Sequence, residues 1–431
     1  MAPSSSRRRR GLRSALAVLL VLALVAFAIA WRPPIARVAT PAMASFDPAL
    51  VHRGARLAAM GNCVSCHTTA EGAAFAGGRG VPTPFGTVFA TNITPDADTG
   101  IGGWSEAAFK RALRAGVSRD GHLLYPAFPY DHFTRLVDGD IHALYAYLMT
   151  RTPVRASAPA NHLMFPLQFR PLLAGWNLLF LQQGPRAQAG SGEAARGAYL
   201  ADALTHCSAC HTPRNRLGAE DRHRFLAGGE AEGWHASALN GESESPLPWS
   251  TDTLATYLRT GLAPGHAMAA GPMQDVVRSL SEVDPADVHA IATYITGTMG
   301  PATPERQTRE AAAQQRAQGP LHLDGSPGAR LYADNCASCH DAGRGLSSNT
   351  ALRLPLAVAL YLPDPRNLLH ILRQGIQPEA GRPGRWMPPF EGTLSEEQLT
   401  TLADWLRREA AGQPPWPDLA RAAQDTRPPT P

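Results

Sequence analysis

The sequence has little cysteine, little net charge and few long apolar runs, and each shortage excludes a class of protein. Only six of the 431 residues are cysteine. The arginines at positions 7–10 and 13 account for the net charge of +4, because 35 basic residues face 36 acidic ones from Ser14 onward. A nucleic-acid partner is therefore not indicated. Charged residues make up 18% and hydrophobic ones 44%, which is typical of a globular chain with roughly two to four domains of about 100–200 residues each.

One uncharged run of 18 residues is present, from Ser14 to Trp31, directly behind the arginine cluster 1–13. A secretory core has ~7–15 apolar residues, whereas a spanning helix needs ~17–25. We therefore expect a retained membrane anchor; the alternative is a signal cleaved at Ala28-Ile29-Ala30. In both cases the arginines stay in the cytoplasm and the rest of the chain is exported, which predicts the periplasmic side of the cell inner membrane.

All six cysteines belong to three copies of the pattern CxxCH. Two thiols at this spacing meet the two vinyl groups of one porphyrin, and the adjacent imidazole reaches its iron, so the pattern indicates haem c. Zinc sites, redox dithiols and disulfides use the same residue types, but three copies with no cysteine left over disfavour them. The sequence thus predicts three covalent haem c groups, attached through Cys63 and Cys66, Cys207 and Cys210, and Cys336 and Cys339, with His67, His211 and His340 as iron ligands.

The sequence around the motifs repeats, which indicates three domains. Each motif follows a short helical segment and precedes a second helix that ends in Gly, predicted at 104–116, 249–261 and 364–375. A closing helix completes each repeat and carries an aromatic residue at the same position. The expected N-caps are Ser105, Ser250 and Asp364, the expected C-terminal glycines are Gly116, Gly261 and Gly375, and the aromatic residues are Tyr147, Tyr294 and Trp405.

Candidate distal iron ligands lie twelve residues after the terminal glycine of the second helix. This count gives Met273 in the second repeat and Met387 in the third. A lone Met usually fills a core, but two at one repeat offset are predicted to bind iron opposite the histidine, which raises the potential of the haem. Met268 is a weaker alternative to Met273.

The first repeat differs at this position. The same count from Gly116 reaches Phe128 in YPAFPYDHF, and a phenyl ring cannot bind iron. His132, four residues further on, is the predicted replacement. The alternatives are that His132 is a solvated loop residue, that the iron has no sixth ligand, or that Met149 in the closing helix binds it.

With these motifs the chain resembles the triple-haem cytochrome c subunits of membrane-associated periplasmic dehydrogenases. The resemblance spans Asp47 to about Arg408 and is most specific in TPFGTVFATNITPD, GWSEAAFKRALRAG, YPAFPYDHF, CHTPRN and GPMQDVV. Alcohol and gluconate dehydrogenase cytochromes usually carry Met where Phe128 stands. The Phe resembles instead the cytochromes that accompany molybdenum hydroxylases acting on aldehydes, nicotinate or isoquinoline.

The resemblance implies an electron-transfer subunit, not an enzyme. Electrons would pass from a periplasmic dehydrogenase large subunit, which is molybdenum-, quinone- or flavin-dependent, to quinone or a terminal oxidase. The sequence itself contains no molybdenum, iron–sulfur or flavin motif, so substrate oxidation is expected in the partner. The alternative function is a haem enzyme, peroxidase-like, that uses an open first haem.

The expected fold is all-α, with three tandem cytochrome c domains behind the N-terminal helix. The apolar segment 162–181 is expected to be a strut between domains one and two, with the membrane or the dehydrogenase as its alternative contact, and the tail is expected to be mobile or to bind a partner. The boundaries are 1–13 basic segment, 14–31 anchor or signal, 32–46 linker, 47–157 domain 1, 158–188 apolar linker, 189–300 domain 2, 301–324 linker, 325–410 domain 3 and 411–431 Pro-rich tail.

Overall fold

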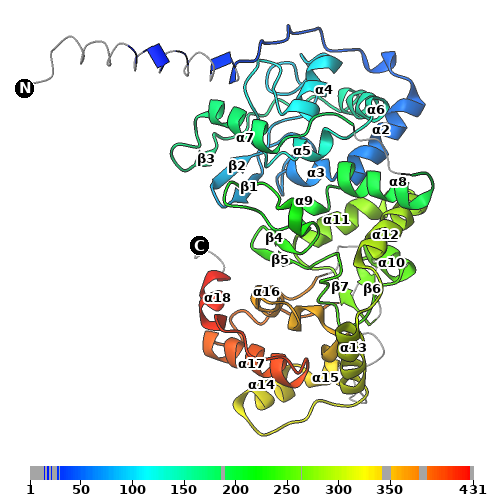
Figure 1. Ribbon diagram of the computed structural model, residues 1–431, viewed down its shortest axis with the longest axis vertical. Coiled ribbons are helices and arrows are strands. Elements are labelled where there is room, and N and C mark those ends of the chain that lie inside the picture. The colour runs from blue at the N-terminus through cyan, green and yellow to red at the C-terminus, as the bar shows by residue number, and fades with distance from the viewer. Residues whose placement is uncertain are drawn as a thin grey trace, which may run out of the picture. The chain divides into compact units, whose positions relative to one another are not determined.

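The computed structural model describes residues 31–185, 190–263, 265–341, 351–377 and 386–427, together with isolated positions between 14 and 30. The chain divides into two compact units (Figure 1). The first unit contains residues 1–55 and 66–186, and the second contains residues 56–65 and 187–431. Both units are mainly helical with very short strands, so the all-α prediction is right for the helices and missed three small sheets.

The first unit holds the first repeat and the apolar segment that follows it. Its sheet has the order β1-β2-β3, with β1 antiparallel to β2 and β2 antiparallel to β3. The elements are η1 (Met43–Ser45), α2 (Pro48–Met60), which continues into the second unit, α3 (Cys63–Cys66), of which only Cys66 belongs to the first unit, β1 (Gly80–Thr83), β2 (Gly86–Phe89), α4 (Glu106–Ala115), α5 (Tyr130–Phe133), α6 (Asp138–Met149), β3 (His162–Leu163), η2 (Arg170–Leu172) and α7 (Leu173–Phe180).

The second unit holds the second and third repeats. Its two sheets are the antiparallel pairs β4-β5 and β6-β7. The elements are α8 (Glu193–Tyr199), η3 (Leu200–Leu204), α9 (Ser208–His211), η4 (Arg222–Arg224), β4 (Gly229–Ala231), β5 (Trp234–Ala236), α10 (Thr251–Thr260), β6 (Leu262–Ala263), β7 (Ala267–Met268), α11 (Pro272–Ser281), α12 (Pro285–Met299), α13 (Pro304–Ala317), α14 (Pro327–Asn335), α15 (Ala337–His340), η5 (Leu354–Leu356), η6 (Val358–Leu360), α16 (Arg366–Gln374), α17 (Glu396–Glu409) and α18 (Leu419–Asp425).

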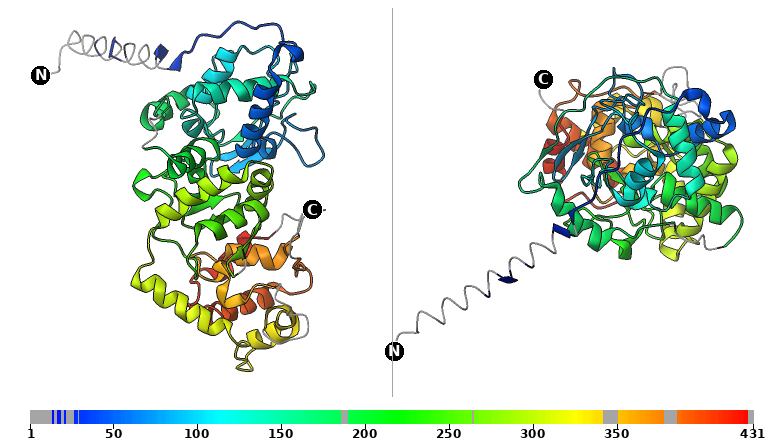
Figure 2. Two further views of the ribbon diagram at one scale, coloured as in Figure 1. Left: turned by 90° about the vertical axis from the view of Figure 1, so that its right-hand side faces the viewer. Right: turned by 90° about the horizontal axis from the view of Figure 1, so that it is seen from above.

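The first helix of each repeat crosses the closing helix at a glycine. A Cβ on Gly54 of α2 would collide with the Ala143 carbonyl of α6, and a Cβ on Gly197 of α8 would collide with the Ala290 carbonyl of α12. In the third repeat Gly328 of α14 meets the side chain of Trp405 on α17 instead. The pairing of α14 with α17 is visible in Figure 1, and the ribbons can be followed from other sides in Figure 2.

The same crossing places the aromatic residues predicted as register marks. Tyr147 and Tyr294 lie against Gly54 and Gly197, just as Trp405 lies against Gly328, so the repeat alignment of the closing helices is confirmed. Ion pairs flank two of the crossings, with 2.6 Å between Arg53 Nη2 and Asp140 Oδ1 and 2.9 Å between Arg196 Nε and Asp287 Oδ1.

The second helix of each repeat ends as predicted. Gly116, Gly261 and Gly375 all have positive φ, and each donates its N–H to the carbonyl four residues earlier. Glycine suits this left-handed position because it has no Cβ. Ser105 and Ser250 are the N-caps of α4 and α10.

The third N-cap prediction is displaced by one position. The residue that precedes α16 is Pro365, not Asp364. Asp364 still accepts a hydrogen bond from the Arg366 N–H at 2.8 Å, because Pro365 offers neither a side-chain acceptor nor a donor.

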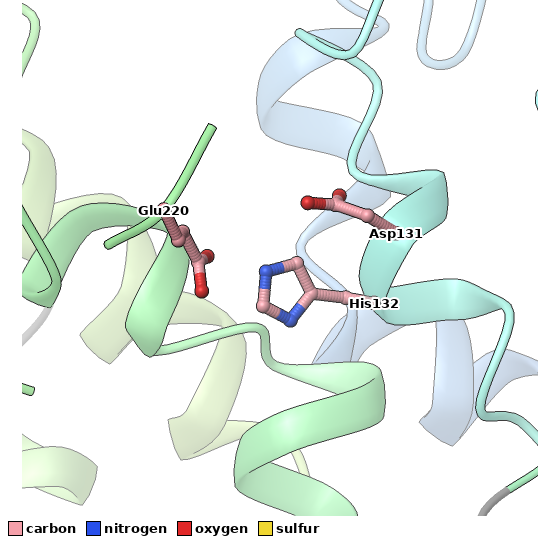
Figure 3. Close-up of side chains that lie close together, drawn as sticks. All are labelled: Asp131, His132 and Glu220. Carbon is pink, nitrogen blue, oxygen red and sulfur yellow. The ribbon is translucent and has the colours of Figure 1, made fainter. Parts of the chain in front are cut away.

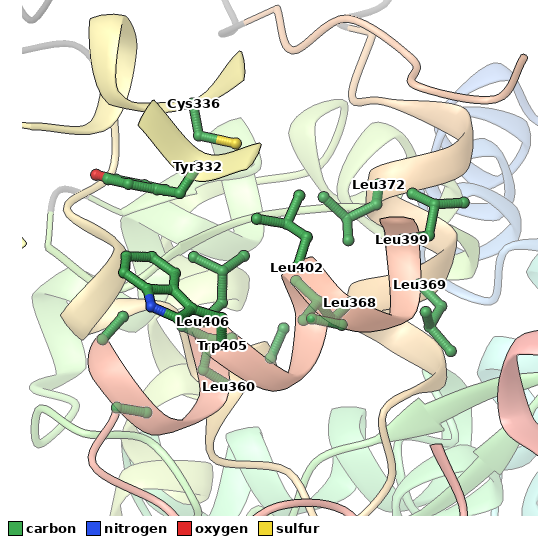
Figure 4. Packing of buried hydrophobic residues seen from close by; sticks show 14 of the residues in the cluster. Tyr332, Cys336, Leu360, Leu368, Leu369, Leu372, Leu399, Leu402, Trp405 and Leu406 are labelled. Atoms are coloured by element: carbon green, nitrogen blue, oxygen red, sulfur yellow. The ribbon is translucent and has the colours of Figure 1, made fainter. Parts of the chain in front are cut away.

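The third repeat encloses a hydrophobic core between α14, α16 and α17 (Figure 4). The chain after α17 completes it. Trp416 is buried, donates its indole N–H to the Leu362 carbonyl at 2.9 Å and stacks under the Arg407 guanidinium. The tail was expected to be mobile or to bind a partner, and the first expectation is wrong for Trp416 and α18, because Pro-rich composition did not reveal either contact with the core. Partner binding by the tail stays a prediction.

Two predicted linkers also have structure of their own. The linker 301–324 contains the α13 helix, whose N-cap Thr303 accepts from Arg306 N. The segment 162–181 packs on the first repeat: β3 extends the sheet, and Asn177 of α7 accepts a hydrogen bond from Tyr130 Oη at 2.7 Å. Its outer side nevertheless keeps six large apolar side chains exposed, which are Met164, Phe165, Phe169, Leu172, Leu178 and Leu179.

Within the described residues, no helix combines the length and apolar character that a membrane crossing requires. Most of the predicted anchor 14–31 lies outside these residues.

We predict that Gly197→Ala destabilises the protein because the added methyl group meets the Ala290 main chain, which cannot rotate away. Overpacking of this kind costs about 1–3 kcal/mol, measured as the free energy of unfolding in guanidinium chloride. Gly297→Ala on α12 is the control, because a Cβ there meets nothing within 4 Å and alanine favours a helix by up to about 1 kcal/mol. Equal stability of the two variants would contradict the crossing.

Candidate functional site

The three CxxCH motifs begin with short helices. Cys63 and Cys66 bound α3, Cys207 is the N-cap of α9, and Cys336 is the N-cap of α15. All six cysteines lie in described parts of the chain, and none of them forms a disulfide there. Burial raises the pKa of Cys207 to about 11 and that of Cys336 to about 12. Neutral thiols at helical spacing suit attachment to one rigid group.

The three predicted proximal histidines share one geometry. Each ring donates its Nδ1–H to a main-chain carbonyl, at 2.6 Å from His67 to Thr91, 2.7 Å from His211 to Ser237 and 2.7 Å from His340 to Leu352. Burial lowers the pKa of all three imidazoles, opposed by these hydrogen bonds. The ring is therefore neutral, and the Nε2 lone pair is left for a metal.

A buried histidine of the second repeat is a further indication that this repeat binds a cofactor. His266, in the turn between β6 and β7, is 5% exposed and stacks on Trp249 with 4.0 Å between ring centroids. Its Nδ1 has no hydrogen-bond partner among the described residues, and burial lowers its pKa to about 4. The donor set of two thiols and an oriented imidazole, together with this orphaned nitrogen, fits a haem.

Two ways of aligning the second repeat with the third select different distal ligands for the second repeat. Ile376, one residue after Gly375, exchanges both main-chain hydrogen bonds with Met387. The corresponding residue after Gly261 is Leu262, which pairs with Met268 rather than with Met273. In the third repeat the intervening loop is longer, so counting from the glycine and matching the strand pairs select different methionines.

Position relative to the closing helix still favours Met273. Met273 is the second residue of α11 and lies eleven residues before Asp284, the N-cap of α12, whereas Met387 lies eight residues before Ser395, the N-cap of α17. Met268 is five residues further away. Both Met273 and Met387 are partly buried, and Met387 packs on the core of the third repeat.

The first repeat places an aromatic cluster at the corresponding point. Phe128 packs against Phe133 and Tyr130, with 5.5 Å and 6.3 Å between ring centroids. The residue after Gly116 is Val117, which pairs with Leu123, and a leucine side chain cannot bind iron either. Neither alignment therefore supplies a thioether here.

His132 is a buried helical residue, 1% exposed, on α5. The alternative that His132 is a solvated loop histidine is thus wrong, whereas its role as an iron ligand stays a prediction. Figure 3 shows Asp131 and His132 projecting from α5, and their ligand atoms lie within 4.8 Å of each other. The other nearby histidine, His122, lies 2.6 Å from the Asp120 carboxylate through its Nδ1, and Met149 is buried at the end of α6.

The main-chain acceptors Thr91, Ser237 and Leu352 were not anticipated from the sequence. They lie 24, 26 and 12 residues after their histidines, so no constant spacing marks them. One signal was present in the first repeat, because Thr91 lies in TPFGTVFATNITPD. There the buried Asn92 holds the chain by donating to the Val154 carbonyl at 2.7 Å.

This geometry defines a c-type cytochrome, and comparison with known proteins agrees. The family model described as cytochrome c matches residues 51–152 and 194–298, and that of cytochrome c oxidase, cbb3-type, subunit III matches residues 324–406. The gluconate 2-dehydrogenase cytochrome c subunit of Pantoea cypripedii is 38% identical, over 84% of this chain and 86% of its own. The alcohol dehydrogenase (quinone) cytochrome c subunit of Gluconobacter oxydans is 34% identical, over 84% and 79%.

The chain belongs to the cytochrome c subunits of dehydrogenase complexes. It is an electron-carrying subunit that binds haem c covalently, and it works with a dehydrogenase partner. The haem-enzyme alternative finds no support among these relatives. A nicotinate dehydrogenase subunit of Pseudomonas putida is 46% identical over 94% of this chain, but the chain spans only about a third of that protein, 34% of its length.

We predict that Met273→Leu removes one thioether-to-iron absorption band from the oxidised protein and lowers the potential of one haem, because leucine offers no lone pair. Met268→Leu, five residues earlier in β7, is the matched control and should change neither. Met387→Leu should remove a second band. If Met268→Leu removes the band instead, the strand pairing gives the correct alignment and the count from the glycine does not.

We predict that His132→Ala converts one low-spin haem of low potential into a high-spin species, because the ligand of the first iron is lost. Low-temperature electron spin resonance and a redox titration measure the change. The control is His122→Ala, which leaves α5 intact. Unchanged spectra in His132→Ala, or three His/Met signatures in the parent protein, would exclude His132 as the ligand.

Proposed function

We propose that this chain carries three haem c groups, one in each of three cytochrome c domains, and relays electrons through them from a periplasmic dehydrogenase. The observation that carries the proposal is the threefold repetition of a CxxCH motif with a histidine whose Nδ1 is bound to a carbonyl. When bound, haem supplies reversible one-electron chemistry. The chain attaches it through two thiols and orients the imidazole.

The residues that would hold each group follow from the repeats. Cys63, Cys66 and His67 bind the first, with His132 opposite. The second and third sites use Cys207, Cys210, His211 and Met273, and Cys336, Cys339, His340 and Met387. A histidine in place of methionine lowers the potential of the first site and so separates it in energy from the other two.

We further propose that the protein lies on the periplasmic side of the inner membrane, held by residues 14–31. Two structural features of the first unit support a membrane location. Ala30, at the end of the apolar run, packs on a small cluster of Val117, Leu123 and Ala174. Ala174 belongs to α7, on whose segment Phe165 is 78% and Leu178 72% exposed. An apolar surface beside the end of an anchor suits contact with lipid.

The dehydrogenase partner is proposed to be a molybdenum hydroxylase that acts on an aldehyde or a nitrogen heterocycle. Similarity to the nicotinate dehydrogenase subunit supports this class, as does Phe128 in place of methionine. Quinone or a terminal oxidase is the proposed acceptor. Purification from native membranes, with identification of the large subunit that accompanies the chain, tests the partner directly.

We predict that the intact mass of the mature chain equals that of the polypeptide plus three haems, because all three motifs present the same donors. The same measurement defines the N-terminus: a mass that includes residues 1–31 supports the anchor, whereas a chain that begins near Trp31 leaves only a signal. A variant with Cys336→Ala and Cys339→Ala is the control and should lose one haem. Two or fewer haems in the parent chain would refute the proposal.

A further inference from the structure

The hairpin β4-β5 is bonded to the haem-attachment segment of the second repeat. Gly228, just before β4, donates its N–H to the His211 carbonyl at 2.9 Å, and Ser237, just after β5, accepts from His211 Nδ1. Gly229 lies so close to the Cys210 carbonyl that a Cβ would collide with it. Both ends of the hairpin are thereby tied to the CxxCH segment.

The other side of the hairpin is bonded to α16 of the third repeat. Asn367 Oδ1 accepts from His235 N at 2.8 Å, and Asn367 Nδ2 donates to the His235 carbonyl at 2.8 Å. One side chain therefore satisfies both main-chain groups of His235, as a neighbouring strand would. Arg366 Nη1 lies 2.7 Å from Glu230 Oε2 beside this pair.

Trp234 fills the junction. Its indole stacks on His370 of α16 with 4.7 Å between ring centroids and 24° between planes. The indole also meets Gly271, where a Cβ would overlap it. Gly271 is the N-cap of α11, which carries Met273, so the indole lies between the distal segment of the second repeat and α16.

The turn of the hairpin fixes the orientation of the His370 ring in this contact. Glu232 and Gly233 both have positive φ, the conformation of a tight type I′ turn. The Gly233 carbonyl then accepts from His370 Nε2 at 3.3 Å, while His370 Nδ1 accepts from Gln374 Nε2 at 3.3 Å. The tautomer of His370 and the orientation of its ring are therefore defined on both sides.

α16 continues into the distal segment of the third repeat. Its terminal Gly375 is followed by Ile376, which is paired with Met387 through two main-chain hydrogen bonds of 3.0 Å and 2.9 Å. A second tie joins the two distal segments, because Gln274 Nε2 donates to the Gln377 carbonyl at 3.3 Å. The ligand segments of the second and third repeats thus form one continuous bonded framework.

We propose that this junction, made of Trp234, His235, Asn367 and His370, fixes the second and third haem segments relative to each other and so sets the rate of electron passage between them. Trp234 and Asn367 are positioning residues: neither offers a ligand to iron, and both act through the segments that do. The inference rests on the proposed function, because it assigns a haem to each of these two repeats.

The first test is hydrogen exchange at the junction of the full, haem-loaded chain. Asn367→Leu keeps the branching of the side chain and its number of heavy atoms but removes both bonds to His235, so protection of the His235 N–H should fall about thirtyfold, the factor for two hydrogen bonds of about 1 kcal/mol each. Asn240→Leu is the matched control. Asn240 likewise donates to one carbonyl, that of Phe225 at 3.0 Å, and accepts one N–H, that of Glu242 at 2.9 Å, but only within the second repeat.

The second test measures electron redistribution after a reducing flash. In a variant with Asn367→Leu and Trp234→Leu, part of the fast phase between the second and third haems should be lost to a slower phase, in proportion to the open fraction that hydrogen exchange finds in this same variant. The midpoint potentials and ligand spectra should stay as in the parent. Asn240→Leu should keep the whole fast phase.

Two results would overturn the inference. One is an opened junction with the fast phase unchanged. The other is a shift in either haem's potential or ligand spectrum, which would show that the residues act on the cofactor rather than on its position. Haem content is measured in the same samples: fewer than three haems would contradict the proposed function, whereas the exchange test at His235 still decides whether Asn367 holds the junction.

Discussion

The hydrogen bond from a histidine Nδ1 to a main-chain carbonyl is the interaction on which the candidate sites depend. A neutral imidazole has two nitrogens, and only the one without hydrogen can bind a metal. Donating Nδ1–H to Thr91, Ser237 or Leu352 decides this in favour of Nε2 and fixes the plane of the ring. Because the acceptors belong to the main chain, the conformation of the following loop, not the type of its side chains, controls the ligand.

This dependence explains which parts of the molecule could be predicted from sequence. The terminal glycines of the second helices and the aromatic residues of the closing helices follow from short-range rules, since a left-handed residue favours glycine and a close helix crossing excludes a Cβ. The carbonyl acceptors follow no such rule. Their distance along the chain differs in every repeat, and only the folded loop brings them to the histidine.

Long-range contacts account for the other differences. Trp416 lies in a Pro-rich stretch that composition alone assigns to a mobile tail, yet the core of the third repeat supplies it with the Leu362 carbonyl and the Arg407 guanidinium. The distal loops differ for a related reason. Ile376 and Met387 remain hydrogen-bonded to each other however many residues the loop between them contains. Added loop residues do change the number of residues between Gly375 and the methionine, so counting from the glycine cannot show where the loop has lengthened.

The junction between the second and third repeats shows how little charge is needed to hold the two repeats together. The Arg366–Glu230 ion pair lies at the surface, where the Glu230 side chain is largely exposed, and such pairs contribute little and weaken with salt. Burial lowers the pKa of His370, so its stack on Trp234 involves a neutral ring and persists at neutral pH. Direction comes instead from Asn367, whose two hydrogen bonds allow only one orientation of β5 on α16. Neutral, directional contacts suit an electron relay, because their strength does not change as the charge on the neighbouring sites changes with each electron.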